Sequence, residues 1–553
     1  MAVLPWRGTK RLGYVEYLVH GDGYYTSVLI VLEILRRRLA DLGSTVHHYD
    51  IDVTIRDASG TLVHQSSRPY PGTAPFARLV SRDFLPADRV LTGSIEFLIR
   101  CWDGHGRSLD EAVIKSDIAP DAFLLWTDER RTCTCTHTNM ATGQAEPLWR
   151  ALRNAEWKAR ELLGSNHTYA GAISVVDNEH FTSALVLQSY NVRWRKIPLE
   201  LRNGAGAALR AEAPSLAPHQ VREVAISDVF PAARTFLKDG PGNILVKSYP
   251  EDLRRYRFLV KTTHRRSGTF SLDHSYYMSK IAQVTYSAAD HARLGKGFMF
   301  PHSVLITNTL TTSVILFNNE LEDREKVIGL LLYDAQGRRV RHDPRAVTLP
   351  PRGFAHFDFR TYLNLAAHEG FDGHFEFYYA EPCTAESQFA ARLHGQVLYH
   401  SPTARESTQV DAAVPWHSPR GFERPPWVLK YQTVFMVIPY FCTDALETFV
   451  HFANVSHAWD YGDAAAFNCE LVDQDGCVVS RQRIEVGPNA HVYQSLRTLF
   501  TGHPRDGVGL VFVKALDPDF SWLPLHYFIE CGAAGVTTSD HGQGLYAYHL
   551  IGQ

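Results

Sequence analysis

The stretch FNCELVDQDG (467–476) joins an alternating strand to a tight turn, and this combination decides the fold. Apolar side chains recur at every second position from Phe467 to Leu471, the period of a strand with one buried face. An acid three residues before a glycine is typical of a hairpin turn. Asp bonds to nearby backbone groups there, and Gly adopts the left-handed conformation. The stretch therefore predicts a β-hairpin.

The same combination occurs four times along the chain. The four turns are DASG (57–60), NGAG (203–206), DAQG (334–337) and DQDG (473–476). A proline-marked segment, an aromatic step and a glycine-bounded apolar strand follow each turn in the same order. The proline-marked segments are YPGTAPF (70–76), LAPHQVR (216–222), LPPRGFAHF (349–357) and VGPNAHVY (486–493). Landmarks that recur in one order at similar spacing indicate an internal fourfold repeat.

A strand that ends in histidine closes each repeat. The four strands are RTCTCTH, GTFSLDH, GQVLYH and GVTTSDH, and they end at His137, His274, His400 and His541. Short alternating runs, separated by turn residues every 8–12 positions or so, are typical of antiparallel sandwiches. We therefore predict an all-β fold of four tandem β-sandwich units. At the level of pattern these resemble immunoglobulin-like or fibronectin-type modules, and the resemblance supplies no functional residues.

The repeat also sets the expected domain boundaries. Three sandwich units are expected before a proline-rich linker, and the fourth follows it. An amphipathic stretch with leucines at helical spacing predicts one helix between units one and two. The expected ranges are 1–142 for unit one, 143–168 for the helical linker, 169–285 for unit two, 286–405 for unit three, 406–426 for the proline-rich linker and 427–553 for unit four.

Composition narrows the partners and the compartment. The net charge is −3, which argues against a broad basic surface for nucleic acid or an anionic membrane. The N-terminal residues lack a signal-peptide pattern, and the most apolar run (28–35) is too short to span a bilayer. Eight scattered cysteines form no CxxC pair, which fits reduced thiols. We expect a cytoplasmic protein with no nucleic-acid partner and no membrane insertion.

The stretch TCTCTHT (132–138) raises the question of a metal site. Cys133, Cys135 and His137 share one face of a strand, and thiolates with imidazole are zinc ligands. The simpler interpretation is that the cysteines are small apolar fillers of the core; a reactive thiol is a third interpretation. In the repeat alignment the cysteines give way to Phe270 and Leu272 in unit two.

Only the histidine is common to all four repeats. His137, His274, His400 and His541 therefore have either a shared structural task or, if they converge, a shared metal site for an ion such as zinc. The pairs Asp273-His274 and Asp540-His541 suggest a catalytic dyad. However, neighbouring strand residues point to opposite faces, so any partner has to come from elsewhere. The chain contains no HExxH, Walker-type, GxSxG or Rossmann-type motif.

Aromatic residues near turns and repeat histidines are candidate binding residues. Exposed rings would stack on sugars or anchor a protein partner, whereas buried rings would belong to the core. These candidates are Tyr276, Tyr277, Trp459, Tyr461, Trp522 and Tyr546.

The function expected from these observations is a structural, assembly or interaction component rather than an enzyme. Repeated sandwiches need only surfaces to bind, whereas an enzyme needs convergent polar groups. Its partner would be another protein or a second copy of the chain. The first alternative is a metal-binding protein or metal-dependent enzyme that uses the repeat histidines. The second is a carbohydrate-recognising protein.

Overall fold

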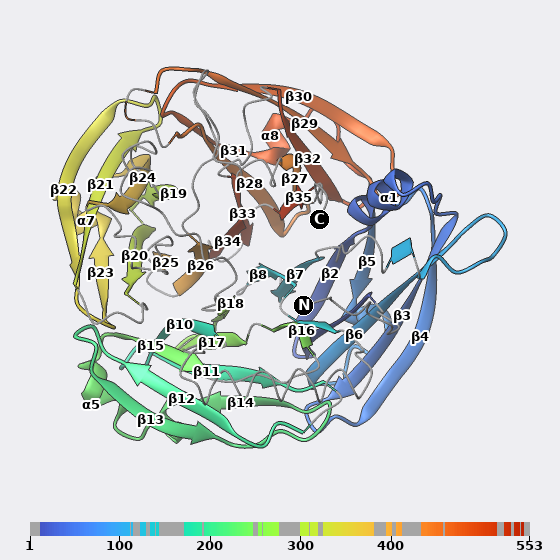
Figure 1. The fold of residues 1–553 in the computed structure, drawn as a ribbon, viewed down its shortest axis with the longest axis horizontal. Coiled ribbons are helices and arrows are strands. Elements are labelled where there is room, and N and C mark those ends of the chain that lie inside the picture. The colour runs from blue at the N-terminus through green and yellow to red at the C-terminus, as the bar shows by residue number, and fades with distance from the viewer. Residues whose placement is uncertain are drawn as a thin grey trace, which may run out of the picture.

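A computed structural model gives the fold of the chain (Figure 1). It describes residues 12–110, 112–113, 122–128, 133–138, 140–142, 171–190, 193–246, 253–256, 258–275, 299–308, 310–318, 325–380, 394–400, 405–411, 433–456, 459, 461–516, 525–531, 536–541 and 543–546. In these residues the strands form eight antiparallel sheets, and the predicted all-β class is confirmed.

Four consecutive segments of the chain supply these sheets. The first segment contains β1 (Leu12–His20), β2 (Tyr25–Val31), α1 (Leu32–Asp41), β3 (His48–Asp57), β4 (Leu62–Pro71), β5 (Phe76–Val80), η1 (Ser81–Asp83), β6 (Leu91–Trp102), β7 (Ala122–Thr127), β8 (Cys133–His137) and β9 (Met140–Thr142). The second contains β10 (Gly171–Val176), β11 (Phe181–Gln188), β12 (Ile197–Arg202), β13 (Ala208–Ala213), β14 (Val221–Ala225), α4 (Ile226–Val229), α5 (Ala233–Leu237), β15 (Pro241–Val246), β16 (Leu253–Tyr256), β17 (Leu259–His264) and β18 (Phe270–His274).

The other two segments repeat this order. The third contains β19 (Met299–Ile306), β20 (Thr311–Phe317), β21 (Lys326–Asp334), β22 (Arg339–Leu349), β23 (Phe354–Asp358), α7 (Phe359–Leu363), β24 (Phe371–Tyr379), β25 (His394–His400) and β26 (Arg405–Asp411). The fourth contains β27 (Thr433–Phe441), β28 (Leu446–Ala453), β29 (Ala465–Val472), β30 (Val478–Val486), β31 (His491–Ser495), α8 (Leu496–Leu499), β32 (Val508–Ala515), β33 (Leu525–Cys531), β34 (Val536–His541) and β35 (Gln543–Tyr546).

Two strand orders recur among the sheets. One order appears as β1-β6-β3-β4, β10-β15-β12-β13, β19-β24-β21-β22 and β27-β32-β29-β30. The first of these sheets is extended by β9 and β16, and the last by β35. The other order appears as β5-β2-β7-β8, β14-β11-β17-β18, β23-β20-β25-β26 and β31-β28-β33-β34. Each segment thus contributes one sheet of each order.

The predicted turns form by the predicted chemistry. Asp473 Oδ1 accepts hydrogen bonds from the backbone N–H groups of Asp475 at 3.0 Å and Cys477 at 2.9 Å. Asp57, Asn203 and Asp334 bond their own turns in the same way. The four turn glycines all have positive φ, between 80° and 90°.

These turns also join the segments. A Cβ added to Gly60 would lie 3.0 Å from Pro218 O, and one added to Gly206 would lie 2.2 Å from Pro351 O. The same arrangement recurs further along the chain: an added Cβ would lie 2.4 Å from Pro488 O at Gly337 and 2.9 Å from Thr73 O at Gly476. Each hairpin turn therefore abuts the proline-marked segment of the next unit. The last contact joins the fourth segment to the first, which closes the chain into a ring (Figure 1).

Apolar clusters bridge the junctions between segments. One cluster combines Leu29 and Phe123 of the first segment with Val437 and Phe512 of the fourth. Others join the second segment to the first, the second to the third, and the third to the fourth. Burial of apolar surface is the main favourable term in association, so these clusters hold the ring together.

The strands that end the four sheets of the second order, β8, β18, β26 and β34, lie at the middle of the ring (Figure 1). β8 contacts β18 and β34, and β26 contacts the same two strands. These four strands therefore surround a common centre. Residues far apart in the sequence meet there.

A hydroxyl that forms the same hydrogen bond in each segment marks equivalent positions in the four segments. Thr26, Ser183, Thr312 and Thr448 each accept a hydrogen bond of 2.9 Å from a backbone N–H seven residues earlier. Each lies near the start of the second strand of its segment, in β2, β11, β20 or β28. The sequence analysis missed this signal, which is a Ser or Thr at one fixed position of each repeat.

When equivalent residues are aligned through these hydroxyls and the strand pairing, the histidine predicted for the third repeat, His400, does not match the other three. His137, His274 and His541 occupy equivalent positions in β8, β18 and β34, and the equivalent residue in β26 is Gln409. His400 ends β25, the preceding strand. Because the true last strand lacks a histidine there, the prediction took the strand before it. As a result β26 falls almost wholly within the predicted linker, 406–426.

The helices differ from the prediction. The helix predicted within 143–168 lies outside the described residues, whereas α1 in the first segment was not predicted. Leu32, Leu35 and Leu39 bury one face of α1, and Glu33 pairs with Arg36 on the same helix. No helix in the described part of the chain has the length and apolar character needed to cross a membrane.

Candidate functional site

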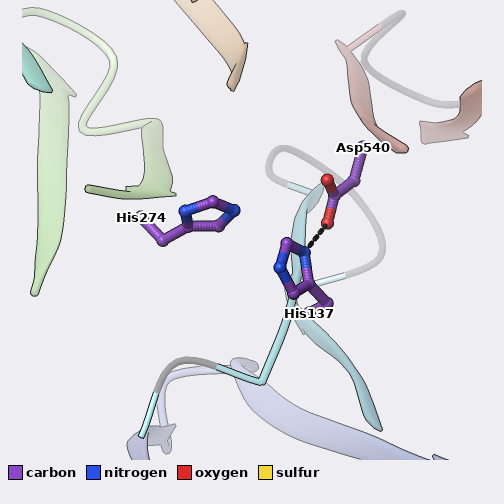
Figure 2. Close-up of side chains that lie close together, drawn as sticks. All are labelled: His137, His274 and Asp540. Carbon is purple, nitrogen blue, oxygen red and sulfur yellow. Dashed lines mark hydrogen bonds and ion pairs between the residues drawn. The ribbon is translucent and has the colours of Figure 1, made fainter. Parts of the chain in front are cut away.

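Two of the predicted histidines meet at the centre of the ring. His137 ends β8 and His274 ends β18, and both side chains are buried. Their ring centroids are 4.5 Å apart, and the ring planes meet at 77°. Figure 2 shows the His274 ring directed toward His137. The two residues come from different segments and are brought together by the contact between β8 and β18.

Asp540 completes this cluster. Its Oδ2 atom lies 3.0 Å from Nδ1 of His137, and the two side chains are 4% and 0% exposed (Figure 2). Asp540 belongs to β34 in the fourth segment. The carboxylate therefore contacts a histidine that belongs to another segment of the chain. This agrees with the alternation of side chains along a strand.

The three side chains form a compact set of donors. One ligand atom from each of His137, His274 and Asp540 lies within 4.8 Å of the other two. We call these residues the central cluster. Within the described residues, it is the one group of three or more histidine, cysteine, aspartate or glutamate side chains with metal-binding spacing.

Hydrogen bonds orient His274. Its Nδ1 atom lies 3.0 Å from the carbonyl oxygen of Ser275. A carbonyl oxygen can only accept, so Nδ1 of His274 carries a proton. The backbone N–H of His274 donates to Asp273 Oδ1 at 2.7 Å, and Gln396 donates to Asp273 Oδ2 at 2.8 Å. A network that includes the third segment thus fixes the end of β18.

Among the other predicted metal ligands, His400, Cys133 and Cys135 are not part of the central cluster, and the side chain of His541 lies outside the described residues. Nε2 of His400 is 2.7 Å from Ser313 Oγ, within the third segment's own sheet. His541 pairs with His526 through the backbone of β33 and β34. Cys133 and Cys135 form no disulfide and are buried in the apolar cluster that joins the first and fourth segments. Their location matches the simpler interpretation, in which they fill the core.

The predicted aromatic residues separate into exposed and buried groups. Trp459 is 47% exposed and lies against Tyr378, with ring centroids 5.3 Å apart, and against His342. Tyr461 is buried and donates a hydrogen bond of 2.8 Å to Asn454. Tyr546 ends β35, where it pairs with Thr433. The remaining candidates, Tyr276, Tyr277 and Trp522, lie outside the described residues.

A second histidine group was missed by the sequence analysis. Five buried histidines of the third and fourth segments follow one another in space, with ring centroids 3.7 to 6.1 Å apart. Along this row they are His302, His526, His451, His491 and His374. The signal available in the sequence was a histidine within an apolar run, as in LETFVHFA (446–453).

The middle histidine of this row is strongly perturbed. Burial lowers the pKa of His451 well below its ordinary value, and the neighbouring His491, His526 and His374 lower it further. His491, which lies between His451 and His374, has its Nε2 atom 3.0 Å from Asp372 Oδ1. The row is therefore neutral at His451, because a charge there would be buried without solvent.

No known family model matches the chain, and no curated protein matches it. The candidate site therefore rests on the geometry of the described residues.

Proposed function

We propose that the chain is a non-enzymatic structural component, a ring of four β-sandwich units that assembles with itself or with a protein partner. The observation that carries this proposal is the interlocking of each hairpin turn with the proline-marked segment of the next unit. The contact of Gly476 with Thr73 belongs to the same series and closes the ring. Such a closed ring is a rigid body with a continuous outer rim, which suits a building block.

The units are immunoglobulin-like in general architecture only. Each would pair two antiparallel sheets, as immunoglobulin domains do. In chain order, the sheets of an immunoglobulin constant domain hold strands 1-2-5-4 and 3-6-7. Here the recurrent orders are 1-6-3-4 and 5-2-7-8. The proposal is therefore a sandwich unit with its own strand order.

The outer rim supports an assembly role. β4, β13, β22 and β30 each end a sheet in the described residues, and an edge strand offers backbone groups for pairing with another chain. Large apolar side chains are exposed where three of these strands begin. They are Leu62 at 49%, Val340 at 41% and Val478 at 39%. Arg341, Arg481 and other charged residues on the same strands limit indiscriminate pairing.

Light scattering over a range of protein concentrations tests the assembly. We expect the mass to exceed that of one chain, and we expect Leu62→Lys combined with Val340→Lys to lower it. Leu516→Lys is the matched control, because Leu516 is also exposed but lies after β32 and not on a rim strand. A strict monomer at high concentration would contradict self-assembly, and so would an equal effect of the control.

A second candidate function is carbohydrate recognition at Trp459. The exposed indole beside Tyr378 and His342 offers a flat apolar face next to a polar ring, which is the chemistry of sugar stacking. We expect glycan-array binding that disappears in Trp459→Ala and persists in Tyr461→Phe, since Tyr461 is buried. An array without any signal for the wild type would rule this candidate out.

A further inference from the structure

We propose that the central cluster of His137, His274 and Asp540 binds one divalent transition-metal ion of the zinc class. This inference goes beyond the structural role, because it gives the centre of the ring a ligand. The three donors come from β8, β18 and β34, which belong to the first, second and fourth segments. A bound ion would therefore tie together three segments that are far apart in the sequence.

The chemistry of the donors selects the class of metal. Two imidazoles and one carboxylate suit zinc and its first-row neighbours, whereas calcium and magnesium prefer oxygen ligands throughout. Nδ1 of His274 donates to Ser275 O, so Nε2 is the ring nitrogen through which His274 would bind a metal. Such a hydrogen bond from the second ring nitrogen is the usual support of a metal-bound histidine.

The spacing fits a site that tightens when the ion binds. Ligand atoms about 2.1 Å from a tetrahedral zinc ion lie about 3.4 Å from one another. His137 Nδ1 and Asp540 Oδ2 are already 3.0 Å apart, and the whole set spans 4.8 Å. The ligand atoms would have to approach one another by about 1 Å when the ion binds.

Burial favours a cation at this point. Asp540 and His137 are almost completely removed from solvent, and a buried carboxylate is costly unless it is paired or coordinates a metal. A divalent ion offsets this negative charge more completely than one protonated histidine does.

The third segment supplies no imidazole at the equivalent position. The register places Gln409 where the other segments have histidine, so the site is not fourfold symmetric. Three protein ligands leave one coordination position for water or a small anion. The proposal therefore concerns binding and stabilisation, and it assigns no reaction.

Metal titration of the full chain tests the proposal. The protein is stripped with a chelator, and Zn²⁺ is titrated by calorimetry, with Co²⁺ absorbance as a second probe. We expect one ion per chain and a Co²⁺ spectrum without thiolate charge-transfer bands. Mg²⁺ should not compete. We expect Zn²⁺ to raise the midpoint of thermal unfolding, because it binds only the folded ring.

Variants identify the ligands. His274→Gln and Asp540→Asn should each weaken Zn²⁺ binding at least tenfold. His400→Gln is the matched control, since His400 also ends a strand but bonds Ser313 away from the cluster. Circular dichroism before titration checks that each variant is folded. If a ligand variant fails to fold, the stoichiometry of metal binding to the wild type and its Co²⁺ spectrum still show whether the chain binds one ion.

Two results would overturn the proposal. One is a folded wild-type chain that takes up far less than one equivalent of Zn²⁺ or Co²⁺. The other is equal loss of binding in His400→Gln and His274→Gln. Because light scattering on the same samples reports assembly separately, failure of the metal site and failure of the structural role are distinguishable.

Discussion

Replacing Gly337 by alanine should weaken the junction between the third and fourth segments. Gly337 has a φ of 80°, and a Cβ there would lie 2.4 Å from Pro488 O, 2.9 Å from Ala490 N and 3.0 Å from Asn489 C. All three atoms belong to the backbone, so no side-chain rotation relieves the contact. Carbon atoms normally sit about 3.5–4.0 Å from their neighbours, and the two turns would have to separate by about 1 Å.

The magnitude follows from two separate costs. An alanine in the left-handed conformation costs about 1–2 kcal/mol wherever it occurs. Overpacking against a rigid neighbour adds about 1–3 kcal/mol, and only where such a neighbour exists. Gly268→Ala separates these costs, because Gly268 has a φ of 72° and nothing within 4 Å of its added Cβ. We expect Gly337→Ala to lower the free energy of unfolding by about 1–3 kcal/mol more than Gly268→Ala does.

Urea denaturation of the two variants and the wild type measures the difference. Amide hydrogen exchange gives a local check, because the backbone N–H of His491 donates to Ala335 O across the same junction at 3.3 Å. Exchange at His491 should accelerate in Gly337→Ala and stay unchanged in Gly268→Ala. Equal destabilisation by the two substitutions would refute the idea that the turns interlock.

Further predictions concern a buried hydroxyl and a buried imidazole. Thr448→Val should lower the free energy of unfolding by about 1–3 kcal/mol, because it leaves the N–H of Phe441 without its 2.9 Å hydrogen bond. The control Thr348→Val, on the exposed face of β22, should change it by no more than about 0.5 kcal/mol. Chemical denaturation compares the two variants, and equal effects would contradict the role of the hydroxyl. Since the pKa of His451 is lowered in the fold, the unfolded chain binds its proton first as the pH falls. The free energy of unfolding should therefore decrease below about pH 6.5, by up to about 1.4 kcal/mol per pH unit for this group, and His451→Leu should reduce the slope measured by urea titrations between pH 7.5 and 5.5. An unchanged slope in this variant would show that other groups control the pH dependence.

Much of the architecture could be predicted because its signals are local. The alternation in FNCELV (467–472) and the Asp473 turn depend on residues within one hairpin, and both are present in the structure. The approach of Gly476 to Thr73 depends on residues about 400 positions apart. No local pattern encodes such a contact, so the closure of the ring was not predicted.

The candidate site was predicted in part for the same reason. The repeat histidines pointed to His137 and His274, which do meet. His400 was assigned to the wrong strand because β26 carries Gln409 at the equivalent position. Asp540 was considered only as the neighbour of His541, yet its carboxylate pairs with His137 in another segment. A single sequence gives the position of a residue along its strand but not the strand that faces it from across the ring.

Ring closure has a consequence for synthesis on the ribosome. The first segment buries Leu29, Phe123 and Leu125 against residues of the fourth segment, among them Val437 and Phe512. Of the four segments, the fourth leaves the ribosome last, so this apolar face stays uncovered while the second and third segments are translated. Exposed apolar surface of this kind is where nascent chains aggregate or recruit chaperones. The fourth segment thus covers the exposed apolar face of the first. Nascent chains truncated before residue 433, which lack the fourth segment, should therefore be the species that need a chaperone most.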